Sequence, residues 1–185
     1  MRGDSKVGGG NSPEPPPFSG TPPAQTGSAI RRATPDDARA LKHLIAQLNR
    51  DQGDPDDLLT DAHVERDIIG NPSTIAMVAQ GTDGALIGYA TAHATYETGH
   101  AEHGLYVADL YTSPTHRRRG IARALLAGIA RAGHAQGARH LWLTAKAQNT
   151  AAHAFYRRLG SRGEAVMAFA VVQQDFLNLA AEPPP

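Results

Sequence analysis

The chain has 185 residues and a formal net charge of zero, with 18 Lys and Arg against 18 Asp and Glu. That length suits one ordinary domain, and the balanced charge argues against a dedicated nucleic-acid binder, which usually carries a basic surplus. The absence of Cys excludes a disulfide framework, a thiolate metal site and a thiol nucleophile. No apolar run reaches the roughly 20 residues of a membrane span. The N-terminus lacks the apolar stretch of a secretory signal, so we expect a cytoplasmic protein.

The ends of the chain differ in composition from the rest. Residues 1–28 contain six Gly, six Pro and four Ser and few apolar side chains. Such a segment cannot bury enough surface to offset the entropy lost on ordering. We therefore expect a disordered arm over residues 1–28, one folded domain over residues 29–181, and a frayed Pro-rich tail over residues 182–185.

Hydrophobic periodicity, such as the four-residue spacing of Ile121, Leu125 and Ile129, predicts the elements of the folded part together with turn residues and the helix N-caps Thr34 and Thr60. In chain order they are a strand within 28–33, a helix over 35–49, a polar loop over 51–57, a helix over 61–69, strands over 75–79 and 85–91, a strand over 104–112, a helix over 121–135, a strand over 140–144, a helix over 150–159, a strand over 165–172 and a helical turn over 175–180. Antiparallel neighbours in the first half and strand–helix–strand units in the second half indicate an α/β domain with a mixed sheet.

The most informative segment lies between the strand that ends at Thr112 and the helix that begins near Ile121. Four arginines fall within seven residues there, Arg117, Arg118, Arg119 and Arg123, and Gly120 opens the helix. The first N–H groups of a helix lack intrahelical partners and lie at the positive end of its dipole, so they bind phosphate well. A solvated basic turn at the start of an ordinary helix is the structural alternative.

Spacing narrows the choice of phosphate site. No Gly-Lys-Ser/Thr follows, as a P-loop requires, and the three spaced glycines of a dinucleotide site are missing. The pattern Arg117-x-x-Gly120-x-Ala122 resembles the pyrophosphate motif of the GNAT N-acetyltransferase superfamily, which binds acetyl-CoA. Asn149, followed seven residues later by Tyr156, resembles the family's later Asn…Phe-Tyr…Leu-Gly helix. The resemblance spans about residues 29–172.

This resemblance implies a fold and a reaction. The fold is a mixed, mostly antiparallel central sheet that is splayed between its fourth and fifth strands and flanked by helices. The reaction is direct transfer of acetyl from acetyl-CoA, a cosubstrate, to a primary amine. The family pattern gives two catalytic groups: the backbone N–H of Leu110, on a splayed or bulged strand, stabilises the charge on the carbonyl oxygen, and Tyr156 protonates the departing thiolate. The implied cofactor-binding residues are Leu110, Tyr111, Thr112, Arg117, Arg118, Arg119, Gly120, Ile121, Ala122, Arg123, Asn149, Ala152 and Tyr156.

Residues for the amine acceptor are expected on two strands. They are Asp109, Trp142, Leu143 and Thr144. Asp109 either holds a cationic amine or relays a proton, or it is an edge carboxylate paired with an arginine. A purely structural role remains open for three of the predicted site residues. Trp142 can belong to the core, Asn149 can act only as a helix N-cap, and Tyr156 can be a half-buried core residue. No metal site is expected, because His100 and His103 have no evident third ligand.

Within the superfamily, the closest resemblance is to the diamine branch, the spermidine/spermine and thialysine N-acetyltransferases. Tyr96, the strand residues 105–111 and the run Gly70-Asn71-Pro72 carry it. The chain departs from that branch at Ala108, where the branch has a Glu that is its proposed base and amine anchor. The branch also implies a homodimer.

These observations favour an acetyltransferase that acts on a primary amine of a small molecule: a diamine, a polyamine or an amino-acid derivative. A second enzymatic reading is acetylation of a protein N-terminus, a lysine or an aminoglycoside. A third, from another class, is an acyl-CoA-binding module without catalysis. The retained Tyr156 argues against that module.

Overall fold

A computed structural model describes residues 27–183 of the chain. The arm expected over residues 1–28 lies outside this range apart from Gly27 and Ser28, and so do residues 184–185 of the expected tail. The chain divides into two compact units, one that ends at Leu143 and one that begins at Thr144. None of the helices in the described range has the length and apolar character that a membrane span needs.

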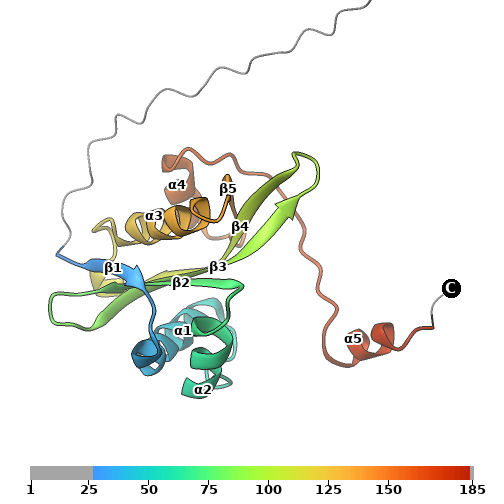
Figure 1. Cartoon of the computed structure of the whole chain (residues 1–185), viewed down its shortest axis with the longest axis horizontal. Coiled ribbons are helices and arrows are strands. Elements are labelled where there is room, and N and C mark those ends of the chain that lie inside the picture. Colours follow the sequence, from blue (N-terminus) through green and yellow to red (C-terminus); the bar gives the residue numbers. More distant parts are fainter. Residues whose placement is uncertain (1–26, 184–185) are drawn as a thin grey trace, which may run out of the picture. The chain divides into compact units, whose positions relative to one another are not determined.

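The first unit is built on a five-stranded sheet whose strand order follows the sequence (Figure 1). The strands are β1 (Ala29–Arg32), β2 (Thr74–Gln80), β3 (Leu86–Glu97), β4 (Glu102–Thr112) and β5 (His140–Leu143). Each of the first four runs antiparallel to its neighbour, and β5 runs parallel to β4. The predicted mixed, mostly antiparallel sheet is therefore confirmed.

β3 is longer than its predicted span of 85–91. It continues to Glu97, which pairs with Glu102 of β4 across a short turn. Threonine and tyrosine near its end, Thr95 and Tyr96, suit a strand, and a long partner strand gives the extra residues their hydrogen bonds. β3 and β4 thus form one long hairpin that reaches beyond the body of the sheet (Figure 1).

The sheet opens between β4 and β5. The two strands pair only from Gly104 and His140 to Val107 and Leu143, whereas β4 runs on to Thr112. Among the described residues, no strand pairs with this outer edge of β4 over residues 108–112. The splay between the fourth and fifth strands, which the family resemblance implied, is confirmed.

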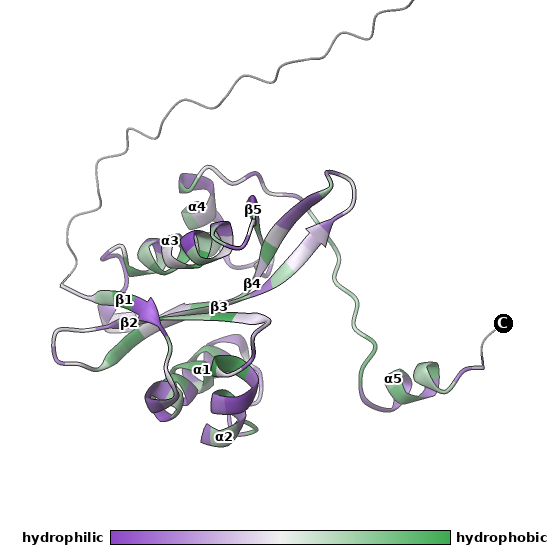
Figure 2. Cartoon of the chain, in the orientation of Figure 1, coloured by the Kyte–Doolittle hydropathy of each residue, from purple (hydrophilic) through white to green (hydrophobic). Residues whose placement is uncertain are grey.

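Helices cover both faces of this sheet (Figure 1). One face carries α1 (Ala38–Gln52), α2 (Asp61–His63) and a π-helical segment (Val64–Ile69). Leu41, Leu44 and Ile45 of α1 pack there in a buried cluster with Tyr89 and Tyr111. Figure 2 shows hydrophobic residues on α1 and along the inner strands. The core therefore lies between α1 and the middle of the sheet.

The second predicted helix is present, but most of it is not an α-helix. A single α-helix was expected over 61–69, but the chain widens into a π-helix at Val64. Gly70 closes it by donating its N–H to the Glu65 carbonyl, five residues back, at 2.8 Å. That wider turn keeps Val64 fully buried while the residues after it follow the surface.

The other face of the sheet carries α3 (Ile121–His134). Ile121, Leu125 and Ile129 are buried at the four-residue spacing that predicted the helix. The helix touches β2, β3 and β4. It follows β4 directly, so its N-terminus lies where β4 ends.

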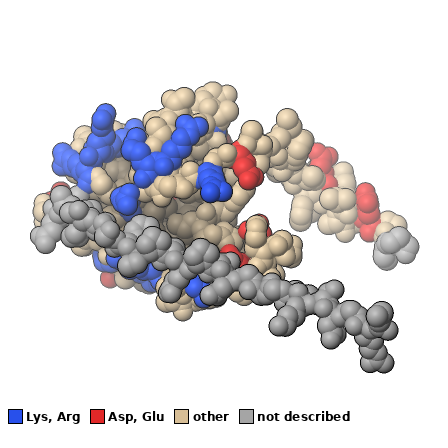
Figure 3. Space-filling model, turned by 90° about the horizontal axis from the view of Figure 1, so that it is seen from above, with Lys and Arg blue, Asp and Glu red and all other residues tan. Residues whose placement is uncertain are grey.

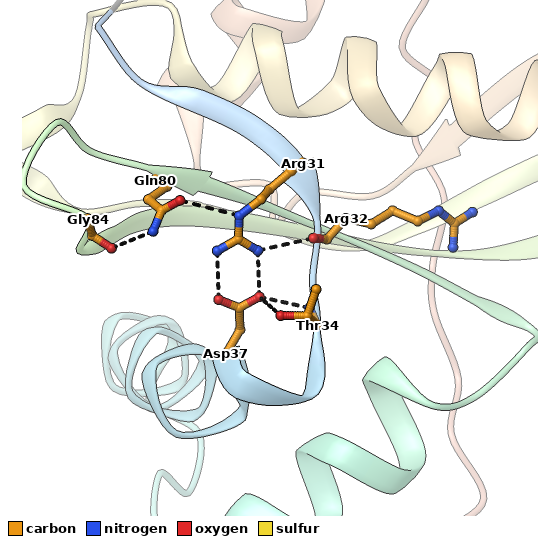
Figure 4. A network of polar contacts seen from close by, with 6 residues as sticks. All are labelled: Arg31, Arg32, Thr34, Asp37, Gln80 and Gly84. Atoms are coloured by element: carbon orange, nitrogen blue, oxygen red, sulfur yellow. Dashed lines mark hydrogen bonds and ion pairs between the residues drawn. The ribbon is translucent and has the colours of Figure 1, made fainter.

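A polar network fixes the first strand to the start of the first helices (Figure 4). Arg31 of β1 binds both oxygens of the Asp37 carboxylate, at 2.6 and 2.8 Å, and the same carboxylate accepts the Thr34 N–H at 2.8 Å. Asp37 is buried, and the hydrogen bonds from Arg31 lower its pKa to about 2. Thr34 is the predicted N-cap, but the turn that it opens is a 3-10 turn, Pro35–Asp37, before α1 begins.

The second unit contains α4 (Thr150–Arg158) and α5 (Gln173–Ala180). Both were predicted, with slightly different ends. The strand predicted over 165–172 is wrong, because these residues form no strand and are exposed, Phe169 by 86%. An apolar run becomes a strand only where a neighbouring strand takes up its N–H and C=O groups, and this segment pairs with none in the described part of the chain.

Candidate active site

A β-bulge lies in β4 just where the sheet opens. Thr91 of β3 pairs with Asp109, but the next residue, Ala92, pairs with Val107, so Ala108 is an extra residue in β4. Val107 is also the last residue of β4 that pairs with β5. A bulge bends its strand and increases the local twist, which leaves Ala108 to Thr112 diverging from β5. Leu110 is on this diverging stretch.

The bulge also decides which side chains share a face. Residues three apart on a regular strand point to opposite faces. Because Ala108 is extra, Asp109 shares a face with Thr91, and Tyr106 shares that same face with His93. Asp109 and Tyr106 therefore lie on one face, the face that α1 covers near Tyr89 and Tyr111.

Asp109 is the titratable group at the centre of this face. Burial raises its pKa, while a hydrogen bond from Thr91 and the nearby His93 act in the opposite direction. The Thr91 hydroxyl donates to Asp109 Oδ2 at 2.8 Å. His93 Nδ1 lies 3.3 Å from the Thr74 hydroxyl on β2. Asp109 is thus not the arginine-paired edge carboxylate that one reading of the sequence allowed, since its partner is a threonine.

Tyr89 lies on the same face, deeper in the core. Its ring is fully buried, and its hydroxyl has no hydrogen-bond partner among the described residues. Burial and the charge of Asp109 raise its pKa, so the phenol stays protonated beside the carboxyl. No local pattern in the sequence distinguishes Tyr89 from an ordinary strand tyrosine.

The turn between β4 and α3 has an unusual backbone. Arg118 has a φ of 64° and Gly120 has a φ of 81°, both in the left-handed region. Such a conformation costs a non-glycine residue of order 1–3 kcal/mol, and left-handed residues in a turn aim successive N–H groups into a concavity that binds anions. The α3 hydrogen-bond ladder then begins with the Ala124 N–H donating to the Gly120 carbonyl at 3.0 Å. Arg118, Arg119 and Arg123 are exposed around this turn, while Ile121 is buried and Ala122 is half-buried.

Arg117 lies in the same turn but its side chain points back to the fold. Its Nε donates to the Thr112 carbonyl at 3.1 Å, and its guanidinium pairs with Asp51 at 3.0 Å and lies over the Tyr111 ring. Tyr111 is itself a core residue whose hydroxyl donates to Gln47 at 3.1 Å. The side chains of both residues therefore stabilise the end of β4.

A cavity of about 290 Å³ opens beside the start of α3. His116, Arg119 and Ile121 line it from the turn, and Gly81 to Asp83 of the β2–β3 turn line it from the other side. Nearby on β4, the hydroxyl of Thr112 is buried and has no hydrogen-bond partner among the described residues. His116 was not predicted as a site residue. Its position within the Ser113–His116 turn was the available signal.

A second cavity, of about 330 Å³, lies over the outer ends of β3, β4 and β5. Its lining residues are Thr95, Tyr96, Glu97, Tyr106, His140 and Trp142. Trp142 is 47% exposed and belongs to this cavity, so the reading of Trp142 as core is wrong. Leu143, the last residue of β5, pairs with Val107 at the point of opening.

The remaining predicted residues belong to the second unit. Asn149 is the N-cap of α4, and its side-chain oxygen accepts the Ala152 N–H at 3.0 Å. Tyr156 lies two turns along α4, half-buried, with its ring centroid 5.3 Å from that of Phe155. Burial raises the Tyr156 pKa, which keeps its hydroxyl protonated near neutral pH. Thr144 is the first, exposed residue of this unit.

Comparison with known proteins decides the family. A model of the acetyltransferase (GNAT) family matches residues 40–161. The chain belongs to this family. A streptothricin acetyltransferase of Streptomyces lavendulae is 37% identical over 83 residues, which are 45% of this chain and 42% of that protein. The match therefore spans less than half the length of that relative.

Solved structures agree with the fold of this GNAT family member. An aminoglycoside acetyltransferase from an uncultured soil metagenomic sample superposes with a TM-score of 0.67 at 24% identity, covering 79% of this chain and 99% of that chain. AAC(6')-Iy, in complex with the bisubstrate analogue CoA-S-monomethyl-acetylneamine, has a TM-score of 0.65 at 24% identity, covering 77% and 97%. The diamine branch is not among these relatives.

Proposed function

We propose that the protein transfers acetyl from acetyl-CoA to a primary amine of a small molecule. One observation carries this proposal: β4 leaves β5 at Val107 and is followed, after a short 3-10 turn at Pro114–His116, by the left-handed residues Arg118 and Gly120 at the start of α3. An open strand edge and an anion-binding turn are thereby aligned on one continuous segment. The relatives that acetylate streptothricin and aminoglycosides support a small amine as the acceptor.

The residues present fit coenzyme A. A diphosphate suits the turn N–H groups and the exposed Arg118, Arg119 and Arg123. A pantetheine chain, with its two amides, suits the unpaired edge of β4 at Leu110 to Thr112, as a peptide does in strand addition. The side-chain oxygen of Asn149 accepts the Ala152 N–H at the N-terminus of α4. In this proposal, the side-chain amide nitrogen of Asn149 therefore contacts the cofactor.

Acetyl-CoA supplies an activated acyl group as a thioester. The amine nitrogen forms the new C–N bond with the acyl carbon as the C–S bond breaks, so no enzyme nucleophile is required. The backbone N–H of Leu110, on the part of β4 that does not pair with β5, stabilises the charge that develops on the carbonyl oxygen, an effect of roughly 2.7–4 kcal/mol for one good donor. Tyr156 gives its proton to the leaving sulfur.

The proton lost by the amine needs an acceptor. Alkylammonium groups have a pKa of about 10, so the attacking nitrogen must be deprotonated at neutral pH. Asp109 is the acceptor that the chain offers, because burial raises its pKa toward the working range of a general base. This assignment replaces the Glu that the diamine branch carries at the position of Ala108. The diamine, polyamine and amino-acid-derivative acceptors remain candidates within it, and a homodimer is part of the same proposal.

Replacing Tyr156 by Phe tests the proposal. We expect kcat to fall by roughly 100-fold, because a positioned general acid contributes about that factor, with little change in the affinity for acetyl-CoA. Thiol release in the presence of a panel of amines measures kcat, and calorimetry measures cofactor affinity. An unchanged kcat with a good acceptor would remove Tyr156 from this role.

A non-catalytic acyl-CoA-binding module is the alternative from another class. The same panel separates the two, since a module binds acetyl-CoA but releases no thiol with any amine. A protein N-terminus, a lysine and an aminoglycoside belong in the panel as the alternative acceptors.

A further inference from the structure

Resting on the function proposed above, we propose that the cavity over β3, β4 and β5 binds a second cationic group of the acceptor. The preferred acceptors are then polycations, in which an ammonium or guanidinium group lies roughly 7 Å from the acetylated nitrogen. The argument uses only residues of the first unit, which line this cavity throughout.

Aromatic rings form one part of the cavity. Tyr106 and Trp142 occupy paired positions on β4 and β5, so their side chains lie on the same face. Indole and phenol faces attract a cation that lies within about 6 Å of the ring centroid, and indole does so best. Trp142, at 47% exposure, leaves such a surface open to a ligand.

The carboxylate of Glu97 forms another part of the lining, and Glu102 is its partner on β4. Glu97 and Glu102 face each other at the end of the β3–β4 hairpin, and each side chain is 49% exposed. His140 lies between them, with Nε2 3.9 Å from Glu97 Oε2 and Nδ1 3.9 Å from Glu102 Oε2. These distances exceed hydrogen-bonding range, whereas Glu97 Oε1 lies 2.9 Å from His100 Nδ1. The pair of carboxylates therefore favours a cation and disfavours an anion.

One glycine gives the cavity its shape. A Cβ on Gly104 would lie 2.1 Å from His140 Nε2, so the imidazole occupies the place of a side chain above the β4 backbone. Any other residue at this position would displace the ring from between the two glutamates. The ring and the carboxylates thus depend on Gly104.

The cavity lies at a useful distance from the proposed reaction centre. Tyr106 is three residues before Asp109, and the bulge at Ala108 places both on one face of the sheet. The residues opposite them on β3, Thr91 and His93, are two apart, so at about 3.3 Å per residue the two positions lie roughly 7 Å from each other. A molecule whose amine is at Asp109 can therefore place a second charged group against Tyr106 and Trp142.

Acceptor series of matched shape test this proposal. Linear monoamines, diamines of increasing length and spermine are compared by kcat/KM at saturating acetyl-CoA. We expect the wild type to prefer a diamine of suitable length over the monoamine of equal length by about tenfold or more, mainly through KM. In the variant Glu97→Gln/Glu102→Gln, the ratio of kcat/KM for the diamine to kcat/KM for the monoamine should fall toward one. Glu65→Gln, at an exposed glutamate of the π-helical segment, is the matched control and should retain the full preference.

Fluorescence gives a measurement that does not depend on acetyl transfer. Trp142 is the only tryptophan of the chain, so its emission reports this cavity directly. Spermine should change the Trp142 emission in a saturable way, whereas a monoamine should give no saturable change. The double glutamate variant should require about tenfold more spermine for half of the full change.

The outcomes separate this inference from the proposed function. Emission that does not respond to spermine, or a diamine preference that survives Glu97→Gln/Glu102→Gln, overturns the second cation site. Spermine binding without thiol release from any acceptor keeps the cation site and overturns the transferase. A response to a basic peptide alone, with none to spermine, shows a protein-docking surface and contradicts a small-molecule site.

Discussion

The two ends of β4 have opposite chemistry. Its first residue, Glu102, faces Glu97 beside an aromatic cavity, whereas its last residue leads into a turn that carries Arg117 to Arg119. Figure 3, seen from the α3 side, shows Lys and Arg side chains gathered over one side of the main body. A chain with zero net charge therefore separates its charges along one strand. The proposed function uses this strand to align an anionic cosubstrate with a cationic acceptor.

The two ends also differ in the groups with which we propose that they bind charge. At the α3 end the main groups are backbone N–H groups in a left-handed turn, supported by arginines that follow one another in the sequence. At the hairpin end the groups are side chains from three strands. A backbone site needs a particular local conformation, and a side-chain site needs particular neighbours. Single substitutions should therefore harm them differently.

Asp109→Asn removes the group between the two ends and should have the largest effect of the three changes considered next. We expect kcat/KM to fall about 100-fold, because a positioned base contributes that much. In the wild type, kcat/KM should fall as the pH drops through the raised Asp109 pKa. A pH–rate profile measures both, and a kcat/KM unchanged in the variant contradicts the proposed role.

Stability gives the second readout for Asp109→Asn. The folded-state pKa is raised, so the folded protein binds this proton more tightly than the unfolded chain, and the ionised carboxylate destabilises the fold at neutral pH. The variant should therefore be as stable as the wild type at pH 7, or more stable, by urea unfolding. A loss of both stability and activity would indicate a purely structural role.

Gly120→Ala tests the anion end. A Cβ at a φ of 81° costs about 1 kcal/mol, and any relaxation of the turn misdirects its N–H groups. We expect the KM for acetyl-CoA to rise about tenfold, with a smaller effect on the acceptor. Gly137→Ala is the matched control, since Gly137 has a φ of 92° and open space around it. If both variants raise the KM equally, the effect is one of stability and not of the site.

Asp37→Asn should lower the stability of the fold without affecting either end of β4. Its pKa of about 2, against 3.8 unfolded, corresponds to roughly 2 kcal/mol of stability. That stability is present above the unfolded-state pKa and is lost as the pH falls through about 2. We expect denaturant unfolding to show a loss of roughly 2 kcal/mol at pH 7, with kcat and both KM values unchanged below the melting temperature.

A surface pair provides the control for Asp37→Asn. Arg66 and Asp67 form a similar contact, but both side chains are more than half exposed, and solvent screens such pairs. Asp67→Asn should therefore leave the unfolding transition nearly unchanged. An equal loss in both variants would show that the burial of Asp37 is unimportant.

The sequence predicted those features that depend on consecutive residues. Gly120 as the start of α3, Thr34 and Thr60 as helix caps, and the four-residue spacing from Ile121 were all visible in short stretches. The splay of the sheet followed from a family resemblance carried by equally local motifs. Features of this kind need no knowledge of what lies opposite in space.

Features that depend on distant partners were missed. The run over 165–172 has the composition of a strand but no strand beside it, and β3 continues to Glu97 because β4 is there to pair with it. In the sequence, nothing distinguishes Arg117 from the other three arginines. In the fold, its guanidinium pairs with Asp51, which is 66 residues away. The cavity around Trp142 draws on three strands whose register no local pattern reveals.

The extra residue Ala108 has a consequence for how this protein can change over generations. Point mutations alter one side chain at a time, but the loss of this one codon would make the pairing of Val107 and Asp109 with β3 regular. Asp109 and Tyr106 would still share a face, but the bend that turns the end of β4 away from β5 would be lost. The opening of the sheet is therefore sensitive to the length of this strand, and not only to its composition.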